Sequence, residues 1–447
     1  MVRCGRRLRA ADREILALAV PALGALVSEP LFLLVDSAIV GALGTEPLAG
    51  LGIAGAVLAT AVNLFVFLAY GTTASVARRL GAGDRRGALT QGVDGLWLAA
   101  GLGVLAAGVS GVGAPLLAGL FDADTTVTAQ AVTYLRWSVP GVPGMLVVLA
   151  STGVLRGLQD TRTPLVVAGS GAVVNAGLNL LLVHGVGLGI AGSGLGTALT
   201  QLGMAVGTTV VVVRAAVREG AALGPDLAGI RAGGLAGLPL LVRTLALRAA
   251  LLTTTYVAAR LGTAPLAAHQ VTSTIWTLLA LSLDAIAIAA QALTGRALGA
   301  GDVLAVRAAT RRMSWWGVGS GVLLMLALLA VRQLAGPLFS PDPAVRSALA
   351  AALVVAALMQ PLAGLVFVLD GVLIGAGDGR YLATTAVAQY LFYLPLAVAV
   401  ARFGPGGTAG LVWLWLSFAG GWMTVRGFFL GRRARGNAWL VVGAKMP

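Results

Sequence analysis

Four acidic side chains lie inside long apolar stretches of the sequence, namely Glu29, Asp36, Asp284 and Asp370. At the middle of a bilayer a carboxylate costs about 2.5–3.5 kcal/mol on insertion scales, so an intramembrane acid is a functional candidate by default. Held away from water, a carboxylate can take up a proton near neutral pH. In its ionised form it can instead bind a hard cation such as Na⁺, together with amide and hydroxyl oxygens. These residues therefore predict ion binding inside a membrane.

Polar residues that could surround Asp36 occur at helical spacing. Glu29 precedes Asp36 by two helical turns and shares its helix face, while Asn175 and Asn179 are one turn apart on another stretch. Together with Thr197, the two amides would give Asp36 hydrogen-bond partners within one half of the chain. This pattern leaves both H⁺ and Na⁺ open as the bound ion. The alternatives are helix bridging for Asn175 and Asn179, and contact with a nearby helix terminus for Glu29.

Other candidates lie along the same kinds of stretch. Asp284 and Asp370 are predicted to face each other across a cavity in the second half and to attract cationic substrates, with a structural role as the alternative. Pro21 lacks a backbone N–H and is the predicted bending point of the first apolar stretch. We expect His269 and Trp276 to serve packing rather than ligand binding.

The elements that must position these residues are membrane-spanning helices. Hydrophobic residues make up 58% of the 447 residues and charged ones only 11%, against roughly 25% charged residues in soluble domains. The mean hydropathy is +0.92. A helix needs about 20 apolar residues to cross a bilayer, which predicts an all-α membrane protein of twelve spans. The spans are expected at residues 15–41, 51–77, 89–113, 128–154, 164–184, 189–214, 235–259, 267–294, 311–336, 345–374, 381–402 and 407–431.

The basic residues are distributed unevenly along these spans. All but five of the 31 lie in alternate loops, in the terminal segments or at adjoining helix ends. The exceptions are Arg136, Arg260, Arg332, Arg346 and Arg402. Because cytoplasmic loops collect Lys and Arg, we expect both termini in the cytoplasm and the chain in the inner (plasma) membrane of the cell. The net charge of +14 then reflects topology and argues against nucleic-acid binding.

The chain contains an internal repeat with a constant offset of 218 residues. The loop Leu80–Asp84 recurs as Leu298–Asp302, and Pro143 recurs as Pro361. An offset of six spans gives both halves the same orientation in the membrane, a known transporter plan with the substrate bound between the halves. The predicted organisation is a cytoplasmic tail (1–14), a six-helix lobe (15–214), a cytoplasmic linker (215–240), a second six-helix lobe (241–431) and a C-terminal tail (432–447).

The repeat breaks where the candidate residues lie. Positions equivalent to the four acids hold Leu247, Thr254, Val66 and Thr152, so no acid has an acidic counterpart. Positions equivalent to Asn175, Asn179 and Thr197 hold Tyr393, Ala397 and Trp415. The shared scaffold therefore does not require these polar residues, which favours a functional role for them.

Several segments, taken in order over nearly the whole chain, resemble the MATE (multidrug and toxic compound extrusion) family and its DinF-like branch. They are Glu29–Asp36 with Val40–Gly44, the loop Leu80–Asp84, Ala267–Gln270, Leu283–Gln291 and Asp370–Asp378. The resemblance implies two parallel six-helix lobes around a central cleft. It also implies export of organic, often cationic, compounds by alternating access in exchange for H⁺ or Na⁺.

The resemblance also implies roles for individual residues. Asp36, Asn175, Asn179 and Thr197 match the cluster that binds the coupling ion and controls bending of the first helix. Asn179 stands where an aspartate is common in the branch; with one carboxylate left, proton coupling through Asp36 is mildly favoured over Na⁺. Gln291 joins Asp284 and Asp370 as a candidate for the cavity of the second lobe. We expect a monomer without cofactor or resident metal.

Two other functions fit the sequence less well. A flippase for a lipid-linked precursor would carry extra spans or a strongly basic central cavity, whereas basic residues here are expected to avoid the membrane interior. An intramembrane enzyme would need catalytic groups, but the chain has two histidines, a single cysteine in its N-terminal tail and no paired metal-ligand spacing. We therefore expect no catalytic residue.

Overall fold

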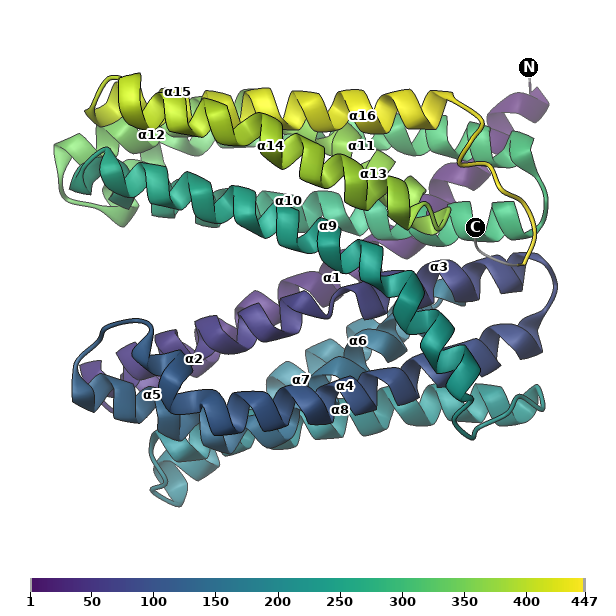
Figure 1. Cartoon of the computed structure of the whole chain (residues 1–447), viewed down its shortest axis with the longest axis horizontal. Coiled ribbons are helices and arrows are strands. Elements are labelled where there is room, and N and C mark those ends of the chain that lie inside the picture. Colours follow the sequence, from purple (N-terminus) through teal and green to yellow (C-terminus); the bar gives the residue numbers. More distant parts are fainter. Residues whose placement is uncertain (1, 445–447) are drawn as a thin grey trace. The chain divides into compact units, whose positions relative to one another are not determined.

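The computed structural model describes residues 2–444, and side chains from Ala11 onward. Helices account for nearly all of this part of the chain, and no strand occurs in it. The first repeat holds α1 (Val2–Gly41), α2 (Thr45–Leu64), α3 (Phe67–Gly81), α4 (Arg85–Gly119), α5 (Thr125–Ser138), η1 (Val139–Gly141), α6 (Val142–Gly157), α7 (Arg162–Asn179), η2 (Leu180–Gly185) and α8 (Ile190–Arg218). The second holds α9 (Leu227–Arg260), α10 (Thr263–Gly299), α11 (Val303–Phe339), α12 (Pro343–Leu358), α13 (Gln360–Gly375), α14 (Gly379–Phe403), α15 (Gly407–Trp415), η3 (Leu416–Trp422) and α16 (Met423–Arg435) (Figure 1).

The predicted set of membrane spans is present. Within the described residues, eleven helical stretches are long and apolar enough to cross a membrane, and the bent pair α12 and α13 provides a twelfth if it is counted as one span. That pair bends by 50° because Pro361, in the first turn of α13, has no N–H with which to continue α12. The loop between the two repeats is shorter than the predicted linker at 215–240, since α8 runs to Arg218 and α9 begins at Leu227.

The helices form two compact units. The N-terminal unit comprises Val20–Gly237, and the C-terminal unit comprises Leu238–Val442 together with the residues up to Ala19. The boundaries fall inside α1 and α9, next to Pro21 and Pro239, which are themselves 218 residues apart. Both helices continue through their prolines. A proline inside a helix removes one backbone hydrogen bond, so each of these helices is weakened where it passes from one unit to the other.

The start of α1 is fixed to the C-terminal unit by charged side chains. Asp12 accepts hydrogen bonds from Arg312 at 2.6 Å through both oxygens and from the indole of Trp316 at 2.9 Å. Two residues later, Glu14 pairs with Arg296 at 2.5 Å. These contacts explain why the first part of α1 belongs to the C-terminal unit.

Glycine permits close helix contacts at equivalent places of the two units. A Cβ on Gly153 of α6 would lie 2.5 Å from the carbonyl oxygen of Ala69 on α3. Its repeat partner Gly371, on α13, faces Ala287 of α10 with the same 2.5 Å separation. Lipid tails do not drive helices together, so close backbone approach at small residues supplies the packing energy.

The repeated loop Leu80–Asp84 ends one helix and begins the next. Gly83 and Gly301 have φ angles of 78° and 75°, a region that favours glycine. The following aspartates, Asp84 and Asp302, each accept a hydrogen bond of 2.8 Å from a backbone N–H in the first turn of the next helix. The motif is therefore repeated because it makes the same turn and helix cap in each unit.

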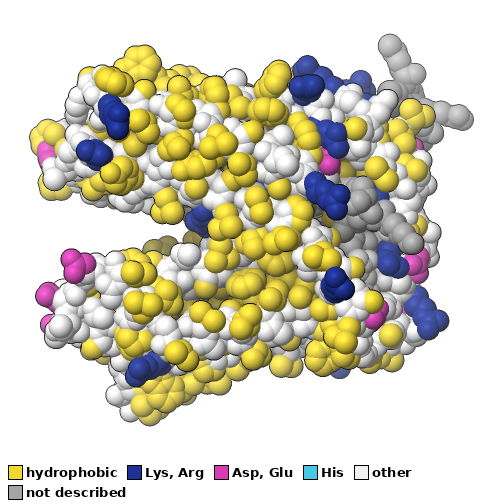
Figure 2. All heavy atoms as spheres, viewed as in Figure 1, with side chains coloured by type: hydrophobic (Ala, Val, Ile, Leu, Met, Phe, Trp, Pro, Cys, Tyr) yellow, Lys and Arg dark blue, Asp and Glu magenta, His cyan; other side chains and the backbone are white. Residues whose placement is uncertain are grey.

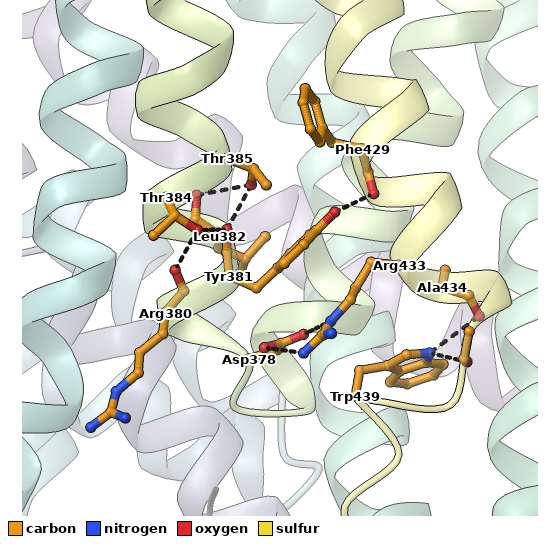
Figure 3. Close-up of polar contacts among 11 residues, drawn as sticks. Asp378, Arg380, Tyr381, Leu382, Thr384, Thr385, Phe429, Arg433, Ala434 and Trp439 are labelled. Carbon is orange, nitrogen blue, oxygen red and sulfur yellow. Dashed lines mark hydrogen bonds and ion pairs between the residues drawn. The ribbon is translucent and has the colours of Figure 1, made fainter.

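The end of the last helix is held by a local polar network (Figure 3). Arg433 donates two hydrogen bonds to Asp378, at 2.6 and 3.1 Å, and its guanidinium lies 4.7 Å from the ring centre of Tyr381. Tyr381 in turn donates to the carbonyl of Phe429 at 2.8 Å. These contacts join α16 to the first turn of α14 and to Asp378 directly before it.

The exposed flanks of the helices are apolar. Val112, Leu116 and Leu323 expose 88%, 72% and 68% of their surface, and hydrophobic side chains are spread widely over the visible face, with few charged ones among them (Figure 2). Water-soluble proteins rarely expose such continuous apolar surface. This surface fits the hydrocarbon of a membrane.

Candidate functional site

Asp36 is completely buried in the N-terminal unit and accepts three hydrogen bonds. The amide of Asn179 donates to Oδ1 at 2.5 Å and the hydroxyl of Ser193 to the same oxygen at 2.6 Å. The hydroxyl of Tyr134 donates to Oδ2 at 3.3 Å. Because these donors come from α7, α8 and α5, one carboxylate on α1 joins four helices.

A second layer of contacts holds these donors in place. The nitrogen of Asn179 that reaches Asp36 also donates to Oδ1 of Asn175 at 3.1 Å, and Tyr134 shares a hydrogen bond of 3.1 Å with Thr197. Thr197 and Asn175 are almost fully buried. The structure thus brings together Asp36, Asn175, Asn179 and Thr197, and we call these four with Tyr134 and Ser193 the Asp36 cluster.

Local backbone features let Asn179 reach the carboxylate. A Cβ on Gly196 of α8 would lie 2.3 Å from Oδ1 of Asn179, so only glycine leaves room for this amide. Directly after Asn179 the chain changes from α-helix to the π-helical turn η2. Single π-helical turns are frequent at functional sites. In the described part of the chain, Oδ1 of Asn179 and Nδ2 of Asn175 have no hydrogen-bond partner.

Tyr134 and Ser193 belong to the cluster but were not predicted from the sequence. Both have apolar counterparts in the second repeat, Ala352 and Leu411. Ser193 also precedes Thr197 by one helical turn. Both residues therefore differ between the repeats in the same way as the intramembrane acids do, and this difference is the sequence signal that marks them.

Glu29 and Pro21 lie apart from the cluster. Seven residues separate Glu29 from Asp36, which corresponds to about 10 Å along a helix. The side chain of Glu29 is exposed and forms no hydrogen bond with another described residue. Pro21 lies about two turns before Glu29 on α1, beside the boundary of the N-terminal unit.

In the C-terminal unit, two arginines lie inside the helix bundle, contrary to the expectation that basic residues avoid it. Arg243 and Arg426 are 7% and 6% exposed, and Asp370 is equally buried. Arg243 donates from Nε to Oδ1 of Asp370 at 3.2 Å and from Nη2 to Oδ2. Arg426 lies 3.6 Å from the same carboxylate and also interacts electrostatically with the half-buried Asp284. Asp284 and Asp370 are thus accompanied by two arginines, which the sequence had assigned to loops or helix ends.

Gln291 occupies a packing position in the same unit. It is 3% exposed, and its backbone carbonyl would lie 2.4 Å from a Cβ on Gly375. The residue therefore lies at a close contact between α10 and α13. No group of three or more His, Cys, Asp or Glu side chains suited to a metal occurs in the described residues.

Comparisons with known proteins agree with this architecture. The profile of the MatE family matches residues 21–181 and again 239–399, two segments offset by the same 218 residues as the repeat. The chloroplastic protein DETOXIFICATION 44 of Arabidopsis thaliana is 31% identical over 434 residues, 92% of this chain and 81% of the relative. The probable multidrug resistance protein NorM of Pseudomonas putida is 30% identical, covering 70% of this chain and 69% of that protein.

Solved structures show the same fold. The Vibrio cholerae MATE transporter VcmN in its bent form has a TM-score of 0.84 at 23% identity, covering 97% of this chain and 99% of VcmN. A transporter from Pyrococcus furiosus, described as having a binding pocket of reverse polarity, has a TM-score of 0.83 at 22% identity and covers 95% of both chains.

Proposed function

Because the chain belongs to the MatE family, whose members are membrane transporters and not enzymes, we propose that it is a secondary active antiporter exporting organic compounds in exchange for H⁺. Asp36 is the proton-binding group in this proposal. The observation that carries it is a fully buried carboxylate on α1 that joins four helices through three donated hydrogen bonds.

The geometry of the Asp36 cluster favours a proton over Na⁺ as the coupling ion. A Na⁺ ion needs several oxygen ligands turned toward it. Here the oxygens of Asp36 are taken up by donors, and the group placed between Asp36 and Asn175 is an N–H₂ rather than an oxygen. A proton needs only one oxygen and can be exchanged within the existing contacts.

Protonation of Asp36 changes what its neighbours can do. Hydroxyl groups of Ser193 and Tyr134 can either donate or accept, but the Asn179 nitrogen can only donate. Once Asp36 carries a proton, the charge that holds the Asn179 nitrogen is lost. The unpartnered Oδ1 of Asn179 can then accept a hydrogen bond from the O–H of protonated Asp36 if the amide rotates. The tie between α1 and α7 is thereby remade in a different geometry.

The size of this effect suits a conformational switch. A hydrogen bond to a charged group contributes ~1.5–3 kcal/mol, which corresponds to about a tenfold to hundredfold change in a two-state equilibrium. With its tie to α7 weakened, α1 can bend at Pro21, which alters the N-terminal unit and releases the substrate. One charge moving across about 100 mV supplies ~2.3 kcal/mol to drive the cycle.

We place the antiporter in the plasma membrane with both termini in the cytoplasm. The distribution of Lys and Arg supports this orientation, and bacterial relatives such as NorM support this membrane. Both repeats lie in one polypeptide, which supports a transporter that works as a monomer.

The predicted attraction of Asp284 and Asp370 for organic cations has less support, because Arg243 and Arg426 accompany them. The same two arginines are the feature expected of a flippase for a lipid-linked precursor. Two carboxylates balance them, however, so the site is not strongly basic. Antiport therefore remains the function that we propose.

The decisive experiment measures efflux of cationic and anionic dyes from proteoliposomes under an imposed pH gradient or Na⁺ gradient. We expect the pH gradient alone to drive efflux and Asp36→Asn to reduce it to the level of protein-free liposomes. Asp302→Asn is the matched control, because asparagine also caps helices. Efflux driven only by Na⁺ would refute proton coupling, and unchanged efflux in Asp36→Asn under both gradients would refute the role of Asp36.

A further inference from the structure

A column of aromatic side chains runs through the interior of the C-terminal unit. Its members come from α10, α14, α15 and η3, and neighbouring rings have centroids 5.0–6.2 Å apart. They are His269, Trp276, Tyr393, Trp415, Phe418 and Trp422, and each exposes 7% of its surface or less. Part of the column is presented by the π-helical turn η3, a form of backbone common at functional sites.

The column occupies the position in its repeat that the Asp36 cluster occupies in the other. Adding 218 to Asn175, Thr197 and Asp36 gives Tyr393, Trp415 and Thr254. Thr254 and Tyr393 share a hydrogen bond of 2.6 Å, at the place where Asp36 and its amides meet in the first repeat. One scaffold position thus holds an ion-binding arrangement in the N-terminal unit and an aromatic arrangement in the C-terminal unit.

Two indole N–H groups in the column lack a hydrogen-bond acceptor among the described residues. The indole nitrogens of Trp415 and Trp422 are buried, and neither finds an acceptor within the described residues. An indole N–H can only donate, and leaving such a group unpaired in the interior destabilises the fold. The column therefore offers two sites for an acceptor atom that the chain itself does not supply.

The column ends at the two buried arginines. The guanidinium of Arg426 lies 5.1 Å from the ring centre of Trp422, and Asp370 links it to Arg243. Guanidinium groups, like indole nitrogens, have hydrogen-bond donors and no acceptor. They bind carboxylates with charge-assisted hydrogen bonds. The two unpaired indole nitrogens and the guanidinium of Arg426 therefore all favour an acceptor.

We propose that this column is the substrate site of the C-terminal unit and that it takes a planar aromatic anion. The rings contact one another in this conformation, so the ring system of the ligand enters by separating them, and its oxygens accept from Trp415 and Trp422. Its carboxylate pairs with Arg426, whose contact with Asp370 is the longer one at 3.6 Å, while Asp370 stays bonded to Arg243. This inference rests on the proposed export function and names its substrate class.

The opposite charge fits the column less well. Aromatic rings also attract cations, but a cation would leave both indole donors unpaired. It would also approach the positive charge of Arg426. The charged group in contact with the rings is the guanidinium of Arg426, and Asp370 lies behind it.

Two dyes with the same xanthene ring system and opposite charge test the proposal. Fluorescein is a planar aromatic anion, and tetramethylrhodamine methyl ester is a cation. Their binding to the full-length protein in nanodiscs is followed by fluorescence anisotropy without any ion gradient. We expect fluorescein to bind more tightly than the rhodamine ester.

Variants locate the site. Trp422→Phe and Trp415→Phe keep the ring and lose the donor, so each should weaken fluorescein binding about fivefold. Arg426→Gln should weaken it about tenfold or more, because the lost donor is charged. Asp370→Asn removes the competing carboxylate and should leave binding as tight or tighter.

Matched controls address folding and placement. Trp439→Phe removes an indole N–H that already donates to the carbonyls of Ala434 and Gly436, and Arg260→Gln removes an exposed arginine from the same helix as Arg243. Both should bind fluorescein like the unmodified protein. The conservative tryptophan variants keep the test valid even if Arg426→Gln does not fold.

The proposal fails if the cation binds more tightly than fluorescein, or if fluorescein binds equally well to both tryptophan variants. Asp36→Asn distinguishes this failure from failure of the proposed antiport. That variant should bind fluorescein normally while losing proton-driven efflux. Normal proton-driven efflux combined with absent fluorescein binding would refute the substrate class alone.

Discussion

The amide nitrogen of Asn179 lies 2.5 Å from a carboxylate oxygen of Asp36, so α1 and α7 are joined through one short charge-assisted hydrogen bond. Charge-assisted bonds are about twice as strong as neutral ones, and this one is enclosed by buried residues from α5 and α8. The bond exists in this form only while Asp36 is ionised. In the proposed mechanism it links the protonation of Asp36 to the position of α1.

Replacing the donor should uncouple that link. In Asn179→Ala, α1 loses its tie to α7 in both protonation states of Asp36, so uptake of a proton no longer changes the preferred conformation. We expect proton-driven dye efflux to fall at least about tenfold, in line with the loss of a bond to a charged group. Efflux rates in proteoliposomes at matched protein content measure it. Asn179→Ala that transports at the normal rate would contradict the mechanism.

A carboxylate at position 179 should allow the cluster to bind Na⁺. Asn179→Asp would place two acidic groups beside Asn175, and carboxylate and amide oxygens together are the ligands that a hard cation prefers. We expect the variant to gain thermal stability when K⁺ is exchanged for Na⁺ at constant ionic strength, whereas the unmodified chain should not respond. Differential scanning fluorimetry in detergent provides the measurement, and an equal response of both proteins would argue against the assignment.

The close contact between α3 and α6 should require glycine at position 153. Gly153→Ala would bring a Cβ to within 2.5 Å of the carbonyl oxygen of Ala69. Overpacking of this kind costs about 1–3 kcal/mol. We expect a clear decrease in melting temperature. Gly101→Ala on α4, where nothing lies within 4 Å of the added atom, is the control and should not lower it.

The fold could be predicted from the sequence because its signals are repeated. Twelve apolar stretches and one constant offset determine the helices and the two units, and the turn at Leu80–Asp84 recurs with the same cap. Local backbone changes could not be predicted in this way. The 50° bend before α13 follows from Pro361, but apolar content alone gave one continuous span there.

The Asp36 cluster could be predicted in part because its acid and amides are costly in a membrane. Hydroxyl groups such as those of Tyr134 and Ser193 are cheap to bury, so hydropathy gives little sign of them. Arg243 and Arg426 were misplaced for a related reason. Each lies near enough to a helix end to be counted with a loop, and only the fold shows that both meet Asp370 inside the C-terminal unit.

Pro21 offers a test of how the cluster acts on α1. The helix is continuous through this residue although a backbone hydrogen bond is missing there, and the boundary between the units lies beside it. Pro21→Ala restores the bond and stiffens the helix, so the bent conformation becomes harder to reach. We expect the maximal rate of proton-driven efflux to fall several-fold with little change in the substrate concentration that gives half-maximal rate. Pro115→Ala, inside α4, is the matched control because it makes the same change in a helix that does not carry Asp36. If both variants slow transport equally, the effect belongs to general stiffening of the bundle. If neither does, α1 does not bend at Pro21 during the cycle, and protonation of Asp36 must act through another part of the helix.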